Sequence, residues 1–280
     1  MKKAELMSKL DEWILEQKYQ EYAETTLTQY KANVLKFLNW INSDEEITKD
    51  TTLKYKMYLG EVAGSTNSIN VWIVTLNKFL KWLGLNDLTI KKIKMQNKQS
   101  VEDVLTVSDY KRLLRISKRE GKDKLYFIMK ILAMTGIRVS ELQYFTVENL
   151  SSNYISVFNK GKERTIIVRQ DLARELRKYC KEKGIKSGYI FLSSIANGKM
   201  LNQSTIWRQM KKVAGRAKVR KNKVHAHSFR HLFAQVFLDT YSNNITELAD
   251  ILGHNSLDTT RLYTRTSDAQ KRAKLEKLTF

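Results

Sequence analysis

The spacing of apolar residues constrains the fold of this 280-residue chain more than any other feature. Apolar side chains recur with a helical period almost throughout, and only residues 154–158 and 164–168 follow a period of two. The turn between them, residues 159–163, contains Lys160-Gly161, so these segments are predicted to form a β-hairpin. The chain is therefore predicted to be mainly α-helical with one small β-hairpin, an α+β fold.

Changes in this pattern divide the chain. Residues 1–88 are predicted to form a helical domain, and residues 89–104 lose the apolar period and are interpreted as a basic linker. Residues 105–266 are predicted to form a second domain, and residues 267–280 a C-terminal tail helix with an apolar stripe. The expected helices of the first domain cover residues 4–19, a segment ending at 40 with Thr26 or Thr28 as its cap, 50–60 and 68–83.

In the second domain, Thr106 and Asp109 have the spacing of a capping box that opens a helix. Residues 124–135 are apolar on nearly all sides, which predicts a buried helix, and Gly136 suits its C-terminal turn. Further helices are expected at residues 171–183, at 204–217, after His227 and at 244–252.

The charge of the chain points to a polyanionic partner. The net charge is +21, and residues 183–238 contain 12 Lys or Arg and no Asp or Glu. A solvated helix face would mix both signs, so a surface for nucleic acid is the better explanation. A membrane is a weaker candidate, because the chain has no amphipathic anchor and no run of roughly 18 apolar residues. The first residues are also too charged for a signal peptide.

Residues 225–263 hold all four histidines of the chain. His227 and Arg230 lie three apart in a helical pattern, which places an imidazole and a guanidinium on one helix face. A guanidinium fork matches phosphate oxygens, an imidazole moves protons near neutral pH, and a tyrosine such as Tyr263 can form a covalent intermediate. This stretch therefore combines an anion clamp, proton-handling groups and a nucleophile.

Some of the candidate residues also have ordinary structural interpretations. Arg138 can be a surface arginine that pairs with Glu141, and Lys160 can be a solubilising charge in a turn. Tyr263 can be a tyrosine at the edge of a core. Each residue alone is weak evidence for a function.

Zinc is an alternative partner for the histidines that the sequence disfavours. His227 and His231 are four apart, but Ser228 follows His227 where a zinc-protease helix has a glutamate. Cys180 is the only cysteine, which excludes an intrachain disulfide and favours a reducing cytosol. We therefore expect no metal, no other cofactor and a cytoplasmic location.

Four motifs in a fixed order carry a resemblance to a known family. TGIRVSEL at 135–142, NKGKER at 159–164, HSFRH at 227–231 and LGHNSLDTTRLY at 252–263 together resemble the tyrosine recombinase (phage integrase) family. The resemblance covers the whole chain and implies a helical core-binding domain followed by a catalytic domain. It also implies a site-specific recombinase that cleaves and rejoins duplex DNA through a covalent 3′-phosphotyrosine.

The resemblance assigns roles to residues of this chain. Glu141 matches the acidic residue that supports the first of two phosphate-binding arginines. The catalytic residues that it implies are Arg138, Lys160, His227, Arg230, His254 and Tyr263. The reaction requires no metal, cofactor or ATP, because the phosphotyrosine conserves the energy of the DNA bond.

The implied partners are duplex DNA with an inverted-repeat core site and further copies of the chain. The resemblance implies a clamp around DNA, without the additional N-terminal domain of larger phage integrases, and a cyclic tetramer on two sites, in which the tail 267–280 is exchanged between protomers. Accessory proteins that bend DNA or set direction are also expected. The residues predicted to contact DNA are Thr66, Asn70, Lys91, Lys92, Lys94, Arg208, Lys211, Lys212, Lys221 and Lys223.

Several alternatives remain open at this point. A bacterial, phage or mobile-element protein of this kind can integrate and excise an element or resolve DNA dimers. A type IB topoisomerase or a telomere resolvase has a similar catalytic set, although the latter usually has a much longer chain. A non-catalytic architectural protein would keep only the basic surface.

Two departures from the family pattern concern the hairpin and proline. The motif NKGKER is one residue shorter than the common form, so Lys162 competes with Lys160 for the catalytic role. Ala226 and Arg169 stand where proline is frequent, and the chain has no proline, although about fourteen are expected for its length. Neither departure removes a reactive group.

Overall fold

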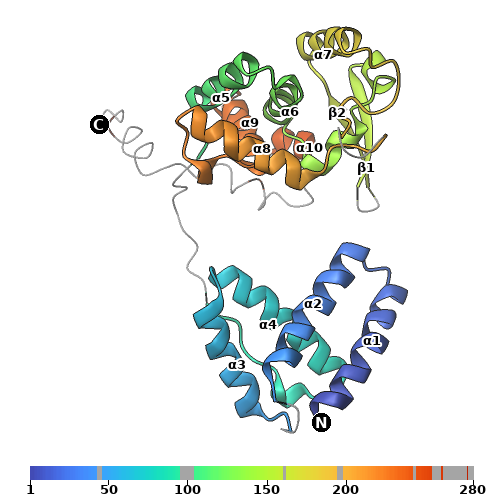
Figure 1. The fold of residues 1–280 in the computed structure, drawn as a ribbon, viewed down its shortest axis with the longest axis vertical. Coiled ribbons are helices and arrows are strands. Elements are labelled where there is room, and N and C mark those ends of the chain that lie inside the picture. The colour runs from blue at the N-terminus through green and yellow to red at the C-terminus, as the bar shows by residue number, and fades with distance from the viewer. Residues whose placement is uncertain are drawn as a thin grey trace. The chain divides into compact units, whose positions relative to one another are not determined.

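The computed structural model describes residues 1–42, 46–94, 104–159, 162–193, 198–241 and 244–253, together with residues 260 and 276. The chain divides into two compact units, Met1–Asn97 and Lys98–Phe280. Within the described residues the chain is mainly helical with one two-stranded antiparallel sheet, which confirms the predicted fold class (Figure 1). No helix in these ranges is long and apolar enough to cross a membrane.

The first unit is a helical bundle around an aromatic core. Trp13, Phe37, Tyr55 and Phe79 are almost completely buried and come from four different helices. The helices are α1 (Lys3–Tyr19), α2 (Glu24–Trp40), α3 (Lys49–Val62) and α4 (Thr66–Trp82), followed by the 3-10 turn η1 (Asn86–Leu88).

Two details of the first unit differ from the sequence-based expectation. The predicted cap at Thr26 or Thr28 is wrong, because the cap of α2 is Ala23, three residues before Thr26, and Thr28 bonds back to the carbonyl of Glu24 within the helix. The unit also extends past residue 88, since Ile90 is 3% exposed in its core. The division at residue 97 falls inside the segment interpreted as a linker.

The second unit surrounds the central helix α6 with other helices and places the hairpin beside them. Thr106 and Asp109 form the predicted capping box at the start of α5. The elements are α5 (Val107–Arg119), α6 (Asp123–Thr135), η2 (Val139–Tyr144), η3 (Asn149–Ser151), β1 (Tyr154–Asn159), β2 (Lys162–Ile167), α7 (Gln170–Glu182), α8 (Gln203–Arg216), η4 (Lys221–Lys223), α9 (Ala226–Thr240) and α10 (Ile245–Leu252).

Helix α6 determines where the candidate site is built. None of its residues is exposed, as its sequence predicts, and it contacts α5, α7, α8 and α9. The helix ends at Gly136, whose φ of 64° is the left-handed conformation that glycine adopts at helix C-termini. The chain therefore leaves the core at a fixed point, two residues before Arg138.

The hairpin is longer than expected. Its strands pair from Tyr154 opposite Ile167 to Asn159 opposite Lys162, so the expected turn at 159–163 is too wide. Extended pairing satisfies additional backbone hydrogen bonds, a gain that a pattern of side-chain polarity does not reveal. Residues 160–161, which include the predicted catalytic Lys160, lie outside the described part of the chain.

Candidate active site

The structure brings four of the predicted site residues into one region of the second unit. Arg138 and Glu141 follow α6, and His227 and Arg230 lie in the first two turns of α9. Lys160, His254 and Tyr263 lie outside the described residues, as does the tail at 267–280 except for residue 276. The roles implied for these residues stay predictions.

Arg230 is held inside the protein by two helix ends. Its side chain is 1% exposed, and its Nη1 and Nη2 groups each donate a 2.8 Å hydrogen bond, to the carbonyls of Gly136 and Leu252 respectively. These carbonyls lie at the C-terminal ends of α6 and α10, where the helix dipole is negative. The buried positive charge is thereby stabilised, and the plane of the guanidinium is fixed.

Arg138 is fixed by Glu141, which is itself 1% exposed. The backbone N–H of Arg138 donates to Glu141 Oε2 at 2.7 Å, and its Nη1 lies 3.4 Å from Oε1. The Arg138 side chain remains 40% exposed while its partner is buried. The pair thus presents a guanidinium to solvent from a carboxylate anchored in the core, and differs from a pair of two surface residues.

Two glycines allow these segments to approach each other closely. A Cβ on Gly136 would lie 2.5 Å from Phe233 Cδ1 and 2.7 Å from Leu252 Cδ2, and a Cβ on Gly253 would lie 2.3 Å from Arg164 Cδ. Both glycines also have a φ of 64°, which disfavours other residues. The packing of the site therefore requires glycine at both positions, in addition to the reactive side chains.

The histidines at the start of α9 are kept neutral near pH 7. The rings of His227 and His231 meet edge to face with centroids 4.7 Å apart. Desolvation lowers the pKa of His227, and electrostatic interactions with Arg230, His225 and Arg138 lower it further. Desolvation, with smaller contributions from His227, His225 and Arg230, lowers the pKa of His231 to about 4. A neutral His227 can accept a proton.

Sequence reasoning assigned no role to three residues that the structure places here. His225 caps α9, because its Nδ1 accepts a 3.2 Å hydrogen bond from the N–H of Ser228. His231 packs on His227, and Arg164 of β2 donates to Glu141. Only Arg164 left a signal in the sequence, as a charge on the apolar face of a predicted strand.

The predicted DNA contacts on α8 fall into two groups. Arg208 and Lys212 are exposed, whereas the Lys211 ammonium donates to the carbonyl of Lys221 and lies 5.4 Å from the centroid of the Trp207 ring. Desolvation lowers the pKa of Lys211. Lys221 and Lys223 lie in the short turn η4, which precedes the histidine-rich start of α9 in the chain.

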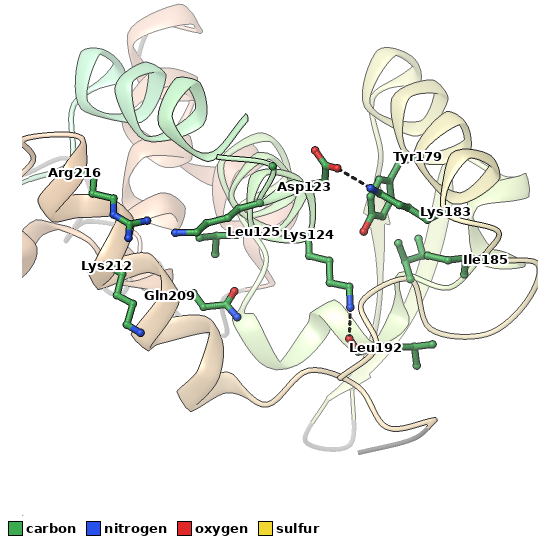
Figure 2. Close-up of a pocket in the computed structure, with 13 residues that line it drawn as sticks. Asp123, Lys124, Leu125, Tyr179, Lys183, Ile185, Leu192, Gln209, Lys212 and Arg216 are labelled. Carbon is green, nitrogen blue, oxygen red and sulfur yellow. Dashed lines mark hydrogen bonds and ion pairs between the residues drawn. The ribbon is translucent and has the colours of Figure 1, made fainter. Parts of the chain in front are cut away.

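A basic pocket borders α8. It has a volume of about 750 Å³ and lies between the start of α6, the end of α7 and α8. Figure 2 shows Lys212 and Arg216 of α8 on one side and Lys124 and Lys183 on the other. Lys183 pairs with Asp123 at 2.9 Å, and Lys124 donates to the Leu192 carbonyl at 2.9 Å. The pocket extends the cationic surface along one flank of α8.

In the first unit, the predicted contact residues lie near the start of α4 and after η1. Thr66 opens α4, and Lys91, Lys92 and Lys94 are exposed. Asn70, in contrast, uses its amide on the chain itself: its Nδ2 donates to the Ile93 carbonyl at 3.0 Å, and its Oδ1 accepts from the Ile93 N–H at 2.8 Å. Asn70 thus holds the lysine segment on α4, and reading a base would require it to release those bonds.

Comparisons with known proteins agree with this arrangement. Residues 103–270 match the model of the phage integrase family. The tyrosine recombinase XerA of Pyrococcus furiosus is 31% identical over 249 residues, which cover 87% of this chain and 84% of that protein. The tyrosine recombinase XerD of Rickettsia bellii is 29% identical over 274 residues, covering 86% and 88%.

Solved structures show the same fold. A lambda integrase fragment, crystallised as a dimer bound to a COC′ core site, has a TM-score of 0.75 at 17% identity and covers 92% of this chain and 94% of that one. The crystal structure of XerA recombinase has a TM-score of 0.53 at 25% identity, with coverage of 98% and 100%. The family match and these relatives define a tyrosine-type site-specific recombinase. The chain belongs to the phage integrase family.

Proposed function

We propose that this recombinase cleaves and rejoins duplex DNA with Tyr263 as its nucleophile and with Arg138 and Arg230 as the clamp on the reacting phosphate. The buried guanidinium of Arg230, fixed by two carbonyls beside the Arg138–Glu141 pair, is the observation that carries this proposal. A phosphodiester accepts a nucleophile only when fixed donors neutralise the charge that develops on its non-bridging oxygens. A fork of two N–H groups does so better than an ammonium.

The proposed cleavage of the DNA strand is a transesterification. The Tyr263 oxygen attacks phosphorus and forms the 3′-phosphotyrosine, while the bond to the 5′-oxygen breaks. The tyrosine proton passes to His227, which the lowered pKa keeps neutral and able to accept it. Lys160 protonates the leaving 5′-oxygen, and His254 adds a donor to the non-bridging oxygens. Reversal of the same steps with a new 5′-hydroxyl rejoins the DNA.

A nicked suicide duplex tests the nucleophile, because loss of the short leaving strand traps the covalent adduct. Tyr263→Phe removes one oxygen, so DNA affinity should be retained and adduct formation abolished. Tyr241, 60% exposed at the end of α9, offers a matched control, and Tyr241→Phe should form the adduct normally. An adduct of wild-type yield in the Tyr263 variant would refute the assignment.

The exposed cations of α8, η4 and the segment at Lys91–Lys94 are proposed to bind phosphates of an inverted-repeat core site. Phosphate contacts position a protein without specifying sequence, so bases are proposed to be read by α4 and α8. The same chemistry serves integration and excision of an element or resolution of DNA dimers in the cytoplasm, with accessory proteins setting the direction. Sequencing the DNA trapped on the wild-type protein would identify the site.

We further propose that four copies assemble on two sites and exchange their tails. A related lambda integrase has been solved as a tetramer bound to a Holliday junction. In this chain, an apolar groove of about 610 Å³ is bordered by Phe233, Val236 and Phe237 of α9 and by Tyr241 just after it, and Val236 and Tyr241 are 43% and 60% exposed. The tail at 267–280 has an apolar stripe of matching character, and a second copy is its proposed donor.

Deletion of residues 267–280 tests this exchange. The truncated protein should fold and bind one site, but it should fail to pair two sites and should show altered cleavage. Val236→Asp in the groove should reproduce the defect in the full-length chain. Recombination of two sites at the full-length rate by both variants would show that other surfaces hold the assembly.

A further inference from the structure

Hydrogen bonds and two short backbone segments form a closed circuit that links the two clamp arginines, and one residue outside the predicted site completes it. Arg230 joins the carbonyls of Gly136 and Leu252. Gly136 lies two residues before Arg138, which is bound to Glu141. Between Glu141 and the end of α10, the connection is made by Arg164 of β2.

Arg164 reaches both partners with one guanidinium. Its Nη2 donates to Glu141 Oε2 at 2.7 Å, and its Nη1 donates to the Ile251 carbonyl at 2.8 Å. Glu141 thus serves two arginines, with Oε1 facing Arg138 and Oε2 bound to Arg164. The consecutive carbonyls of Ile251 and Leu252 accept from Arg164 and Arg230 respectively, so the end of α10 is held by both.

The position of Arg164 in the hairpin explains how a charged residue comes to lie there. Ile166 is 3% exposed on the inner face of β2, and alternation along a strand places Arg164 on that same face. Its side chain is only 15% exposed. The stem of Arg164 also fills the space that a side chain on Gly253 would need. Burial of this charge requires specific partners, and both are supplied by catalytic segments.

We propose that Arg164 is a positioning residue for the recombination reaction, which acts through Glu141 to set the orientation of Arg138 toward the reacting phosphate. A clamp stabilises a transition state only while its donors are held in the productive geometry. The contact between the Arg138 side chain and Glu141 Oε1 is long, at 3.4 Å, so the orientation of Arg138 depends on where the Arg138 N–H and Arg164 hold the carboxylate. Lysine at position 164 would keep the charge but lose the fork that spans two acceptors.

The inference rests on the proposed chemistry, and it is tested by the rate of adduct formation on a suicide duplex that carries the site captured by the wild-type protein. Arg164→Lys should slow the adduct by about 10- to 100-fold while DNA affinity stays close to that of the wild type. Arg174→Lys, at an exposed arginine of α7, should leave the rate unchanged. Melting temperatures of all variants establish that they are folded.

Two further measurements separate positioning from a general loss of structure. If Arg164 acts through Arg138, the double variant Arg138→Ala with Arg164→Lys should be no slower than Arg138→Ala alone. A duplex with sulfur in place of the scissile 5′-oxygen, whose leaving group needs no proton, should not rescue Arg164→Lys. Multiplied rate losses in the double variant would overturn the proposal, and so would rescue by the sulfur substrate, which would assign the defect to the hairpin lysine.

Glu141→Gln provides the same test should Arg164→Lys fail to fold. The amide keeps the shape and one acceptor oxygen but removes the charge that both arginines share, so a similar loss of rate with unchanged DNA binding is expected. A wild-type rate in either folded variant would refute the inference. Because the wild-type adduct and its loss in Tyr263→Phe are measured in the same assay, failure of the proposed chemistry is recognised separately.

Discussion

Replacement of Gly136 by alanine tests whether the close approach of α6, α9 and α10 builds the site. Gly136 has a φ of 64°, and a Cβ there would overlap Phe233 Cδ1 at 2.5 Å and Leu252 Cδ2 at 2.7 Å. Its carbonyl also accepts from the Arg230 guanidinium. The substitution therefore strains the backbone and separates segments that the buried arginine joins.

A second glycine allows the cost of backbone strain to be measured separately from the cost of overpacking. Gly184, after α7, has a φ of 66° and nothing within 4 Å of its missing Cβ. Gly184→Ala should therefore cost only the left-handed strain, about 1–2 kcal/mol of unfolding free energy. Gly136→Ala should add about 1–3 kcal/mol of overpacking, for a total of about 2–5 kcal/mol.

Calorimetry of the full chain, in which the two units can unfold as separate transitions, measures both effects. The extra cost of Gly136→Ala corresponds to a melting temperature about 2–12 °C below that of Gly184→Ala for a unit of this size. The adduct rate of Gly136→Ala should also fall, since displacement of α10 moves the acceptor at Leu252. Equal melting temperatures and a normal adduct rate would show that Phe233 and Leu252 give way freely, and would refute the packing argument.

The remaining predictions concern chemistry, pH and backbone entropy. Alanine at Arg138 or Arg230 should slow cleavage by orders of magnitude with a modest loss of DNA affinity, because many other cations carry the salt-dependent binding; parallel losses would reduce both to ordinary phosphate contacts. Cleavage should persist in excess EDTA, and activity that Mg²⁺ or Zn²⁺ restores would contradict the metal-free mechanism. His231, with a folded pKa of about 4 below an unfolded value of about 6.5, should contribute stability above pH 6.5 that is lost as the pH falls toward 4, by about 3 kcal/mol; His231→Gln should flatten this dependence in urea titrations. Ala226→Pro at the first position of α9, after the extended His225, should raise the unfolding free energy by about 0.4–1 kcal/mol, and a lowered melting temperature would show that its N–H or its conformation is needed.

The sequence predicted those features that depend on local patterns. The capping box at Thr106, the left-handed Gly136 and the buried character of α6 are each encoded within a few residues, and all three are confirmed. The start of α2 was missed because its cap, Ala23, has no side-chain acceptor and so leaves no signal. Local sequence patterns therefore predict the presence of a helix more reliably than they predict the residue at which it begins.

The contacts of the site could not be predicted in the same way. Arg230 binds two backbone carbonyls that are 94 and 22 positions away, and every residue type offers a carbonyl. Only the packing of α6, α9 and α10 determines which carbonyls face the guanidinium. The charge of Arg164 conflicts with the apolar strand pattern around it, so its unusual position could have been recognised from the sequence, whereas its two partners could not. Such conflicts mark positions where a fold gives up local consistency for function.

The electrostatics of the site connect its stability to its chemistry. Arg138, Arg164 and Arg230 carry three positive charges and Glu141 one negative charge, so these four side chains leave a net charge of +2 beside the candidate reaction centre. That excess matches the charge that develops on a phosphate under attack, and it is held by fixed helix ends and hydrogen bonds that need no rearrangement during the reaction. Together with desolvation, the positive charges of Arg230 and Arg138 lower the pKa of His227 and so favour the neutral imidazole that the proposed proton transfer from Tyr263 requires. One arrangement of arginines thereby serves two parts of the proposed reaction: it stabilises negative charge on the phosphate, and it helps to keep His227 neutral so that it can accept a proton. Its cost is mutual repulsion in the free protein, which the phosphate of bound DNA relieves.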